Sequence, residues 1–312
     1  MTLIKSISGI RGTIGGAVDN GLTPIDAVKF AAAYGTWLQQ QYPNQRLKVV
    51  IGRDARISGP MIASLVQQTL VGLGIDIIDL GLSTTPTVEI AVPMEGAQGG
   101  IILTASHNPK QWNALKLLNS KGEFISGAEG EALLQIAADE AFDFAEVDDL
   151  GTITSNASYL EKHIDAILKL PLVDAKAIAA AQFKVVVDAV NSTGGTFVPA
   201  LLRALGVLEI EELYCEPTGH FPHNPEPLPE HLTELSRLVQ TKGAHLGITV
   251  DPDVDRLALV CEDGSMFGEE YTLVAVADYV LTHTPGPTVS NLSSTRALRD
   301  ITEMRGLRYD AA

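Results

Sequence analysis

The chain has 312 residues, of which 46% are hydrophobic and 19% charged, and its formal net charge is −16. This length predicts two or three domains, and this composition excludes an intrinsically disordered protein. The acidic balance argues against binding to nucleic acid or to an anionic membrane surface, because both require a basic surface. No apolar run reaches membrane-spanning length, and residues 1–5 lack a signal-peptide core, so we expect a cytoplasmic protein.

Predicted helices and strands alternate along the first half of the chain. Thr23 and Pro24 are typical of a helix start, as a capping residue and a first-turn proline. The predicted elements are helix 24–41, strand 47–51, helix 60–73, strand 75–80, a helix after Pro86, strand 100–103 and helix 129–139. The alternation predicts the α/β class, with serial domains whose mixed, mainly parallel sheets are sandwiched by helices.

An acidic stretch at 143–149 marks a predicted boundary between an α/β domain at 1–150 and a second at 151–258. The second domain is predicted to contain helix 156–168, strand 183–187, a helix ending at 205, strand 207–213, a helix ending at 242, and strands 246–250 and 257–261. We expect 259–312 to be a partial third α/β domain, with helix 269–281, strand 288–290 and helix 294–305. Its uncovered apolar face predicts a partner, a homo-oligomer or aggregation.

A polar turn, residues 104–109 (Thr-Ala-Ser-His-Asn-Pro), follows the apolar strand at 100–103. Ligands of open α/β sheets bind at the carboxyl ends of strands, so Ser106, His107 and Asn108 are candidate site residues. An ordinary turn is the alternative. Acyl transfer by Ser106 and His107 is disfavoured, because side chains adjacent in sequence are expected to point apart and no G-x-S-x-G motif is present.

Three carboxylates alternate in residues 251–256 (Asp-Pro-Asp-Val-Asp-Arg). On an extended chain Asp251, Asp253 and Asp255 would share one face and repel one another unless a cation neutralised them. Ligands that are all oxygen favour Mg²⁺ or Ca²⁺ over Zn²⁺. An EF-hand begins with the same spacing, but Arg256 stands where that loop requires glycine. A solvated acidic loop remains the other alternative, and Arg256 could hold a phosphate beside the metal.

Two further loops combine glycine with arginine. Arg11 lies in the glycine-rich segment 9–16, whose backbone N–H groups could approach an anion; a flexible N-terminal turn is the alternative. Arg53 begins the polar segment 53–58 at another predicted strand end, where a structural Arg–Asp pair is equally plausible.

Lys116 has apolar neighbours, and burial would lower its pKa and make it a proton acceptor. A surface lysine is the ordinary alternative. His220 and His223 in the proline-rich loop 216–229 could be ligands, although loop histidines usually are not.

These motifs, in this order, resemble those of the α-D-phosphohexomutase superfamily, which includes phosphoglucomutase, phosphomannomutase and phosphoglucosamine mutase. Residues 8–12 (Ser-Gly-Ile-Arg-Gly) resemble its N-terminal loop and 52–59 its second element. Residues 104–116 resemble the phosphoserine loop with its trailing lysine, and 251–256 resemble the metal loop. Segments 114–119 and 291–294 are most similar to bacterial phosphoglucosamine mutase.

The resemblance implies an enzyme that interconverts hexose 6-phosphate and hexose 1-phosphate through a phosphoserine at position 106 and a hexose 1,6-bisphosphate intermediate. Lys116 and Arg11 would assist proton transfer, and His107 would lie beside the phosphoryl group. The implied Mg²⁺ ligands are Ser106, Asp251, Asp253 and Asp255. The implied contacts to the phosphosugar substrate are Arg256, Arg53 and Asn108.

Members of this superfamily have four domains, so we expect residues 259–312 to be a truncated sugar-recognition domain and the fourth, phosphate-binding domain to be absent from these 312 residues. The segment 269–271 (Glu-Glu-Tyr) resembles a sugar-binding loop only superficially, because it opens a predicted helix. A metal-dependent phosphatase and an inactive binding fragment are the alternatives to a mutase.

Overall fold

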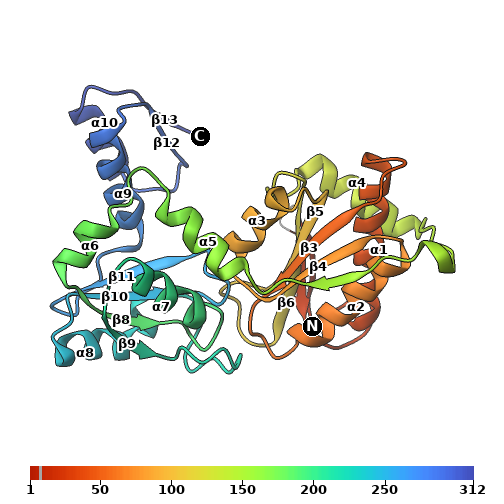
Figure 1. Ribbon diagram of the computed structural model, residues 1–312, viewed down its shortest axis with the longest axis horizontal. Coiled ribbons are helices and arrows are strands. Elements are labelled where there is room, and N and C mark those ends of the chain that lie inside the picture. Colours follow the sequence, from red (N-terminus) through yellow and green to blue (C-terminus); the bar gives the residue numbers. More distant parts are fainter. Residues whose placement is uncertain (7–8) are drawn as a thin grey trace.

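The computed structural model describes residues 1–6 and 9–312, which form two α/β bodies and a C-terminal arm (Figure 1). The first body contains a seven-stranded mixed sheet with the order β1-β2-β6-β5-β3-β4-β7. Its strands are β1 (Leu3–Ser6), β2 (Gly9–Thr13), β3 (Lys48–Arg53), β4 (Asp76–Leu82), β5 (Gly99–Leu103), β6 (Trp112–Leu118) and β7 (Ile153–Ser155). Its helices are α1 (Pro24–Gln41), α2 (Gly59–Gly72), α3 (Thr85–Met94) and α4 (Gly127–Asp139), followed by the short η1 (Val147–Asp149).

Local sequence explains where the helices of the first body begin. Thr23 and Asp26 form a capping box at the start of α1, and Ser126 and Glu129 form another at the start of α4. The Thr84 hydroxyl accepts a hydrogen bond from the backbone N–H of Thr87 and so caps α3. This cap places the amino end of α3 beside the carboxyl ends of β3 and β5, where the candidate site lies.

Helices cover both faces of the first sheet. Helices α1, α2 and α4 share one apolar core with the sheet, and α3 packs on the opposite face together with Tyr159, the first residue of α5 (Tyr159–Leu168). Strand β5 is buried along its whole length, as expected for an apolar central strand covered on both sides. The first sheet therefore holds the Ser106 turn, which follows β5, on a rigid support.

The second body is built on a four-stranded sheet with the order β11-β10-β8-β9. Its strands are β8 (Lys184–Asp188), β9 (Glu209–Leu213), β10 (Leu246–Val250) and β11 (Leu257–Cys261). Its helices are α5 (Tyr159–Leu168), α6 (Ala175–Ala181), α7 (Gly194–Ala204) and α8 (Thr233–Lys242), with the short η2 (Pro229–His231) before α8. The β10–β11 pair is antiparallel, and its connection is the acidic loop 251–256.

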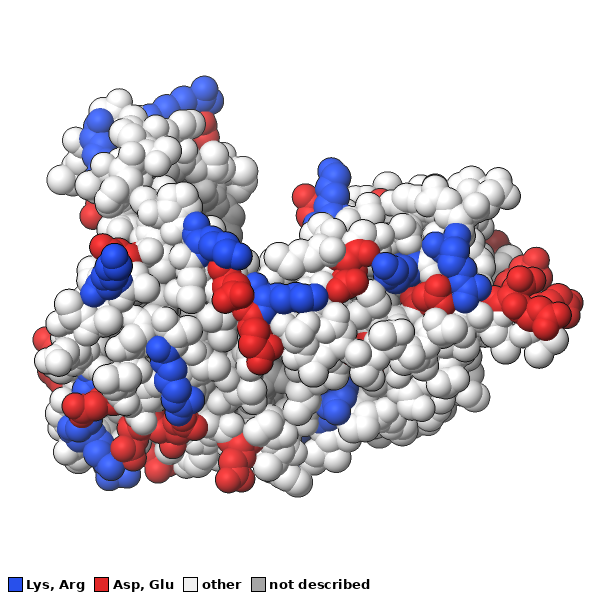
Figure 2. Space-filling model, viewed as in Figure 1, with Lys and Arg blue, Asp and Glu red and all other residues white. Residues whose placement is uncertain are grey.

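The C-terminal arm projects away from the second body (Figure 1). It consists of α9 (Glu269–His283), β12 (Thr288–Ser290), α10 (Ala297–Met304) and β13 (Tyr309–Ala311), and β12 pairs with β13 in parallel. The surface is hollowed between this arm and the first body, and on this face Lys and Arg are scattered among acidic residues (Figure 2). Every helix in residues 1–6 and 9–312 is too short or too polar to cross a bilayer.

The structure confirms the predicted α/β class and the mixed sheets, and it adds elements that the sequence patterns did not indicate. Strands β1, β2, β6, β7 and β13 and helix α6 were missed. The glycine-rich segment at 9–16 is not a flexible turn throughout, because Gly9–Thr13 is strand β2, paired with β1 and β6. Ser8, part of the N-terminal motif, lies outside the described residues.

Strand pairing extends both sheets past the predicted boundaries. Strand β7 pairs with β4, so the first sheet continues beyond residue 150, and β11 pairs with β10, so the second continues beyond residue 258. The acidic residues at 143–149 indicate that this stretch is exposed to solvent, but they do not indicate which strands pair.

We predict that Gly99→Ala destabilises the first body by about 1–3 kcal/mol, because a Cβ there would lie 2.0 Å from the Tyr34 hydroxyl oxygen. That hydroxyl is buried and donates to the carbonyls of Leu118, at 2.6 Å, and Gly100, at 3.2 Å. Tyr34→Phe alone should therefore cost about 1 kcal/mol, but it should stabilise the Gly99→Ala variant by removing the clash. Both tryptophans, Trp37 and Trp112, lie in this body, so urea unfolding followed by fluorescence measures its stability.

Gly286→Ala is the control for a glycine substitution, because a Cβ at that position has no neighbour within 4 Å. Additive effects of Gly99→Ala and Tyr34→Phe would show that the two positions are not coupled.

Candidate active site between the two sheets

The Ser106 turn follows the central strand β5 and has an unusual backbone. Ser106 has φ +50°, a left-handed conformation that few residues other than glycine adopt. Its backbone N–H donates to the Thr104 hydroxyl at 2.9 Å. Its own hydroxyl donates to Asp251 Oδ2 at 2.6 Å and lies 3.3 Å from both Asp255 Oδ1 and His107 Nδ1. The turn thus points the Ser106 hydroxyl at the acidic loop of the other body.

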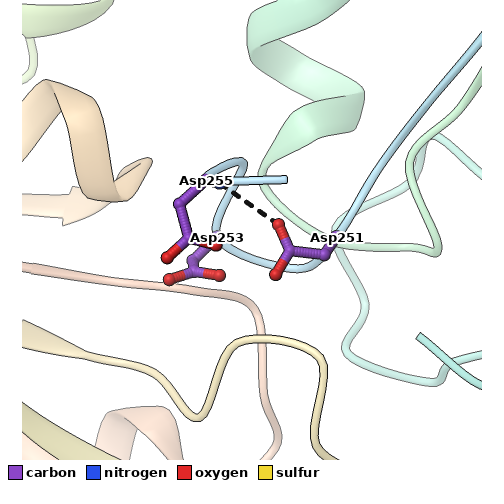
Figure 3. A group of neighbouring side chains, drawn as sticks. All are labelled: Asp251, Asp253 and Asp255. Carbon is purple, nitrogen blue, oxygen red and sulfur yellow. Dashed lines mark hydrogen bonds between the residues drawn. The ribbon is translucent and has the colours of Figure 1, made fainter. Parts of the chain in front are cut away.

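The acidic loop gathers three carboxylates at its tip (Figure 3). One oxygen each from Asp251, Asp253 and Asp255 lie within 4.8 Å of one another. Asp251 Oδ1 accepts from the backbone N–H groups of Asp255, at 3.2 Å, and Arg256, at 3.1 Å, which shapes the loop. The prediction of an extended chain was wrong here: Val254 has φ +64°, and the chain turns tightly. The turn, rather than strand alternation, brings the carboxylates together.

Lys116 of β6 reaches the acidic loop from the first sheet. Its Nζ donates to Asp253 Oδ2 at 2.6 Å and to Asp255 Oδ2 at 2.8 Å, and it is 4% exposed. Burial alone would lower the pKa of Lys116, but the charges of Asp253 and Asp255 outweigh burial and raise it. The prediction that burial lowers the pKa of Lys116 is therefore wrong, because the carboxylates of Asp253 and Asp255 lie beside the buried amine.

The carboxylates fit a hard cation. The buried Asp253 Oδ1 has no hydrogen-bond partner among the described residues, although Asp253 Oδ2 accepts from Lys116 and from the Thr85 hydroxyl at 2.6 Å. Burial and the adjacent carboxylates of Asp253 and Asp255 raise the pKa of Asp251 well above its ordinary value. Burial opposes ionisation of Asp253, but Lys116 outweighs it and lowers the pKa of Asp253. An oxygen-only cluster with an unpaired buried oxygen can bind Mg²⁺ or Ca²⁺.

Four other predicted site residues lie near the Ser106 turn or on the acidic loop. Arg11 Nη1 donates to Asn108 Oδ1 at 2.9 Å, so both side chains line the Ser106 turn. His107 contacts the Ser106 hydroxyl, contrary to the expectation that adjacent side chains point apart, and burial together with the charge of Arg256 lowers the pKa of His107. Arg256 pairs with Glu226 at 3.3 Å on the outer side of the loop.

Arg53 stands apart from the cluster. Its guanidinium donates to the backbone carbonyl of Asp54 at 3.2 Å, and no hydrogen bond joins it to Ser106, Lys116 or the acidic loop within the described part of the chain. The predicted role of Arg53 in binding phosphate is not supported by any contact of this kind.

Two buried charges of the polar segment 53–58, for which a structural Arg–Asp pair was one of two alternatives, support the Ser106 turn. Asp54 and Arg56 form an ion pair at 2.9 Å, and both side chains are fully buried. Arg56 also donates to the carbonyls of Ser106, at 2.5 Å, and Asn108, at 2.6 Å. The sequence signal was an Arg-Asp-x-Arg run at a strand end, but the carbonyls that Arg56 meets lie some fifty residues further along the chain.

Direct contacts join the two bodies around the site. The backbone N–H of Thr85 donates to the carbonyl of Asp253 at 2.8 Å, and the backbone N–H of Ala55 donates to the Ser192 hydroxyl at 3.2 Å. The hydroxyls of Ser192 and Thr193 both donate to the carbonyl of Pro252, at 2.7 and 2.8 Å. The Thr85 bond joins the acidic loop directly to the first body, and the Ser192 and Thr193 bonds, which lie within the second body, fix the loop's conformation; none of these groups carries a net charge.

The loop 216–229 adds a further contact between the bodies. The Phe221 ring lies 5.1 Å from the Arg56 guanidinium carbon, and Glu226 pairs with Arg256. His223 anchors this loop: its Nε2 lies 3.0 Å from Asp188 Oδ2, and its Nδ1 lies 2.8 Å from the carbonyl oxygen of Asn224. The structure thus assigns His223 a carboxylate partner rather than a place among the Asp251, Asp253 and Asp255 ligands.

Sequence comparisons agree with this fold. Residues 3–144 match the profile described as "Phosphoglucomutase/phosphomannomutase, alpha/beta/alpha domain I", and residues 161–264 match domain II of the same family. A phosphoglucomutase/phosphomannomutase of Thermococcus kodakarensis is 34% identical over 301 residues, which cover 95% of this chain and 65% of the relative. A "probable phosphoglucosamine mutase" of Methanopyrus kandleri is 32% identical, with coverage of 96% and 63%.

A solved structure has the same fold. The phosphoglucomutase/phosphomannomutase family protein of Burkholderia thailandensis superposes with a TM-score of 0.82 at 26% identity, covering 99% of this chain and 65% of that one. Fold and site together define an α/β protein with a serine turn facing a carboxylate cluster. The chain belongs to the phosphoglucomutase/phosphomannomutase family, within the α-D-phosphohexomutase superfamily. It spans about two thirds of the length of the relatives described above.

We predict that the His223 anchor stabilises the protein more at pH 6 than at pH 9. Burial alone would lower the pKa of His223, but the bond to Asp188 outweighs burial and raises it, with a smaller contribution from the charge of Glu234. A raised pKa in the folded state means that the stabilisation is complete below the unfolded value of about 6.5 and is lost as the pH rises through the folded pKa. The loss of melting temperature caused by His223→Asn should therefore be larger at pH 6 than at pH 9.

His220→Asn is the matched control in the same loop, because the His220 ring makes no hydrogen bond within the described residues. An equal loss for His223→Asn at both pH values would show that the imidazolium is not the stabilising form.

Proposed function

We propose that this chain carries the phosphoryl-transfer site of a phosphohexomutase, which interconverts hexose 6-phosphate and hexose 1-phosphate through a phosphoserine at position 106. One observation carries the proposal: the Ser106 hydroxyl lies 2.6 Å from Asp251, although 145 positions separate them in sequence. A hydroxyl able to carry a phosphoryl group thereby faces a cluster of hard-cation ligands, as metal-assisted phosphoryl transfer requires.

Mg²⁺ is the proposed metal, with Asp251, Asp253, Asp255 and an oxygen of phosphorylated Ser106 as its ligands. The donor set supports this choice, because the three carboxylates converge and Asp253 Oδ1 is buried without a partner among the described residues. When bound, the cation would neutralise charge on the oxygens of the transferring phosphoryl group.

The protein groups around Ser106 have complementary proposed roles. The backbone of the turn aims the hydroxyl out of the first sheet, and Asn108, held by Arg11, borders the space beside it. Lys116 Nζ is the proposed carrier of the proton that the sugar hydroxyl releases and later takes back. His107 is the proposed neighbour of the phosphoryl group, and its contact with the Ser106 hydroxyl at 3.3 Å supports that place. Arg256 is the proposed contact to the substrate phosphate.

The proposed substrate is a phosphosugar, and the proposed sequence passes through a hexose 1,6-bisphosphate that turns over before its second phosphate returns to Ser106. Glucosamine phosphate is our first choice of sugar, because relatives described as phosphoglucosamine mutases align over nearly the whole chain. Mannose and glucose phosphates are the alternatives, since a phosphoglucomutase/phosphomannomutase is equally similar. A cytoplasmic location is proposed because sugar phosphates are cytoplasmic metabolites.

We predict that incubation with Mg²⁺ and glucose 1,6-bisphosphate adds one phosphoryl group to the protein, measured by intact-mass spectrometry. Ser106→Ala should abolish the adduct, because the Ser106 hydroxyl contacts both Asp251 and Asp255, whereas the Thr85 hydroxyl bonds Asp253 alone. Ser155→Ala, an exposed serine on the remote edge strand β7, is the control and should keep it.

Product analysis separates the proposed class from a phosphatase. Glucosamine 6-phosphate should yield the 1-phosphate isomer, detected by phosphorus NMR. Release of inorganic phosphate as the sole product would favour a phosphatase, and the absence of any Ser106 adduct would favour a non-catalytic binding role.

We further predict that Asp253→Asn weakens Mg²⁺ binding at least about tenfold, measured by isothermal titration calorimetry. The change removes a ligand charge while keeping the side chain's shape and its contacts with Lys116 and Thr85 close to those of aspartate. Asp263→Asn is the control: this exposed turn residue bonds Ser265 and lies outside the cluster. Equal Mg²⁺ affinities for the two variants would contradict the assigned metal site.

A further inference from the structure

Arg56 is one of the largest fully buried side chains of the described residues, and the phosphoryl transfer proposed above gives it no role. Its Nη2 donates to the carbonyls of Ser106, at 2.5 Å, and Asn108, at 2.6 Å. Its Nη1 donates to the carbonyls of Pro109, at 2.8 Å, and Trp112, at 3.1 Å. A single guanidinium therefore holds four carbonyls of the turn that carries the Ser106 hydroxyl.

Asp54 completes this support from the other side of Ser106. Its Oδ2 accepts from Arg56 Nε at 2.9 Å and from the Thr104 hydroxyl at 2.7 Å. The Thr104 oxygen in turn accepts the backbone N–H of Ser106 at 2.9 Å. Both peptide groups of Ser106 are thus tied to one buried ion pair, the N–H through Thr104 and the carbonyl directly through Arg56.

The backbone of Ser106 explains why such support is needed. A serine with φ +50° occupies a strained region, and such conformations persist only where surrounding contacts enforce them. The turn also directs several carbonyls to one point, where they repel one another unless a cation with many donors lies between them. Arginine suits this position because its planar group carries five N–H donors, whereas lysine offers a compact charge of different geometry.

We propose that Arg56 is a positioning residue, whose guanidinium sets the direction of the Ser106 hydroxyl by holding the carbonyls of its turn. The inference rests on the proposed phosphoryl transfer at Ser106. The Phe221 ring, from the second body, lies over the guanidinium, whose side chain is fully buried. Displacement of a reacting group by about 1 Å can cost about 100-fold in rate, and the hydroxyl meets the acidic loop only while the turn keeps this shape.

The test is Arg56→Lys in the full chain, compared with wild type. Three quantities are measured: the rate of Ser106 phosphorylation by glucose 1,6-bisphosphate, the dissociation constant of Mg²⁺, and amide hydrogen exchange of residues 104–112. We expect phosphorylation to slow about 100-fold and exchange in 104–112 to accelerate. The Mg²⁺ constant of the unphosphorylated protein should stay unchanged, because its three carboxylate ligands lie on the other body. Added methylguanidine should restore part of the rate in Arg56→Ala.

Arg46→Lys is the matched control for the loss of a guanidinium. Arg46 also pairs with an aspartate, Asp76, and donates to two carbonyls, those of Asp149 and Leu150. It precedes the amino end of β3, whereas the Ser106 turn follows the carboxyl end of the parallel strand β5, at the opposite end of the sheet. The Arg46→Lys variant should be less stable than wild type, but its Ser106 should be phosphorylated at the wild-type rate. If Arg56→Lys lowers the melting temperature in the same way and phosphorylates at the wild-type rate, Arg56 is merely structural and the proposal is overturned.

Thr104→Val provides a second route if the Arg56 variants do not fold. It removes the tether to the Ser106 N–H and the bond to Asp54 while leaving Arg56 in place, and it should slow phosphorylation and speed exchange in the same direction. An unchanged rate would overturn the proposal. If wild type itself takes up no phosphoryl group, the proposed function fails, and exchange in 104–112 still decides whether Arg56 and Thr104 position the turn.

Discussion

The contact between the Ser106 turn and the acidic loop is the interaction on which the rest of this structure depends. The hydroxyl extends from the end of β5 in the first body and meets Asp251 at the end of β10 in the second. Neither sheet contains the site alone. Thr85, Ser192 and Thr193 hold the acidic loop in place through hydrogen bonds to its backbone carbonyls. The carboxylates of Asp251 and Asp255 therefore remain directed at the Ser106 hydroxyl.

That contact places several like charges in a buried space, and Lys116 balances them only in part. Burial, followed by repulsion from Asp253 and Asp255, raises the pKa of Asp251, and Lys116 opposes the repulsion by pairing with both of these aspartates. One lysine cannot satisfy six carboxylate oxygens, and Asp253 Oδ1 stays unpaired among the described residues. Buried charges without partners are costly. A divalent cation is the simplest group that would complete the balance, which is why the unpaired oxygen is a stronger indication of a metal than the spacing of the carboxylates.

Features that depend on nearby residues were predicted well, and features that depend on strand pairing were not. The start of α1 follows from Thr23 and Pro24, and the apolar run of β5 followed by a polar turn indicated the position of Ser106. Strand β6 was missed although Lys116 was singled out, because its apolar side chains show no alternation once both faces are buried. The pKa of Lys116 was misjudged for a related reason: its burial was visible in sequence, but the carboxylates of Asp253 and Asp255 lie more than a hundred residues away.

The sequence by itself determined the α/β class, the family resemblance and the identity of the serine, the lysine and the three aspartates, because each is carried by a short motif with its own chemistry. Only the tertiary structure decided that these motifs meet, that Val254 turns the acidic loop and that Arg56 supports the Ser106 turn. The physical reason is that a hydrogen bond or an ion pair acts over a few ångströms of space. Distance along the chain says little about distance in space until the strands of both sheets have been paired.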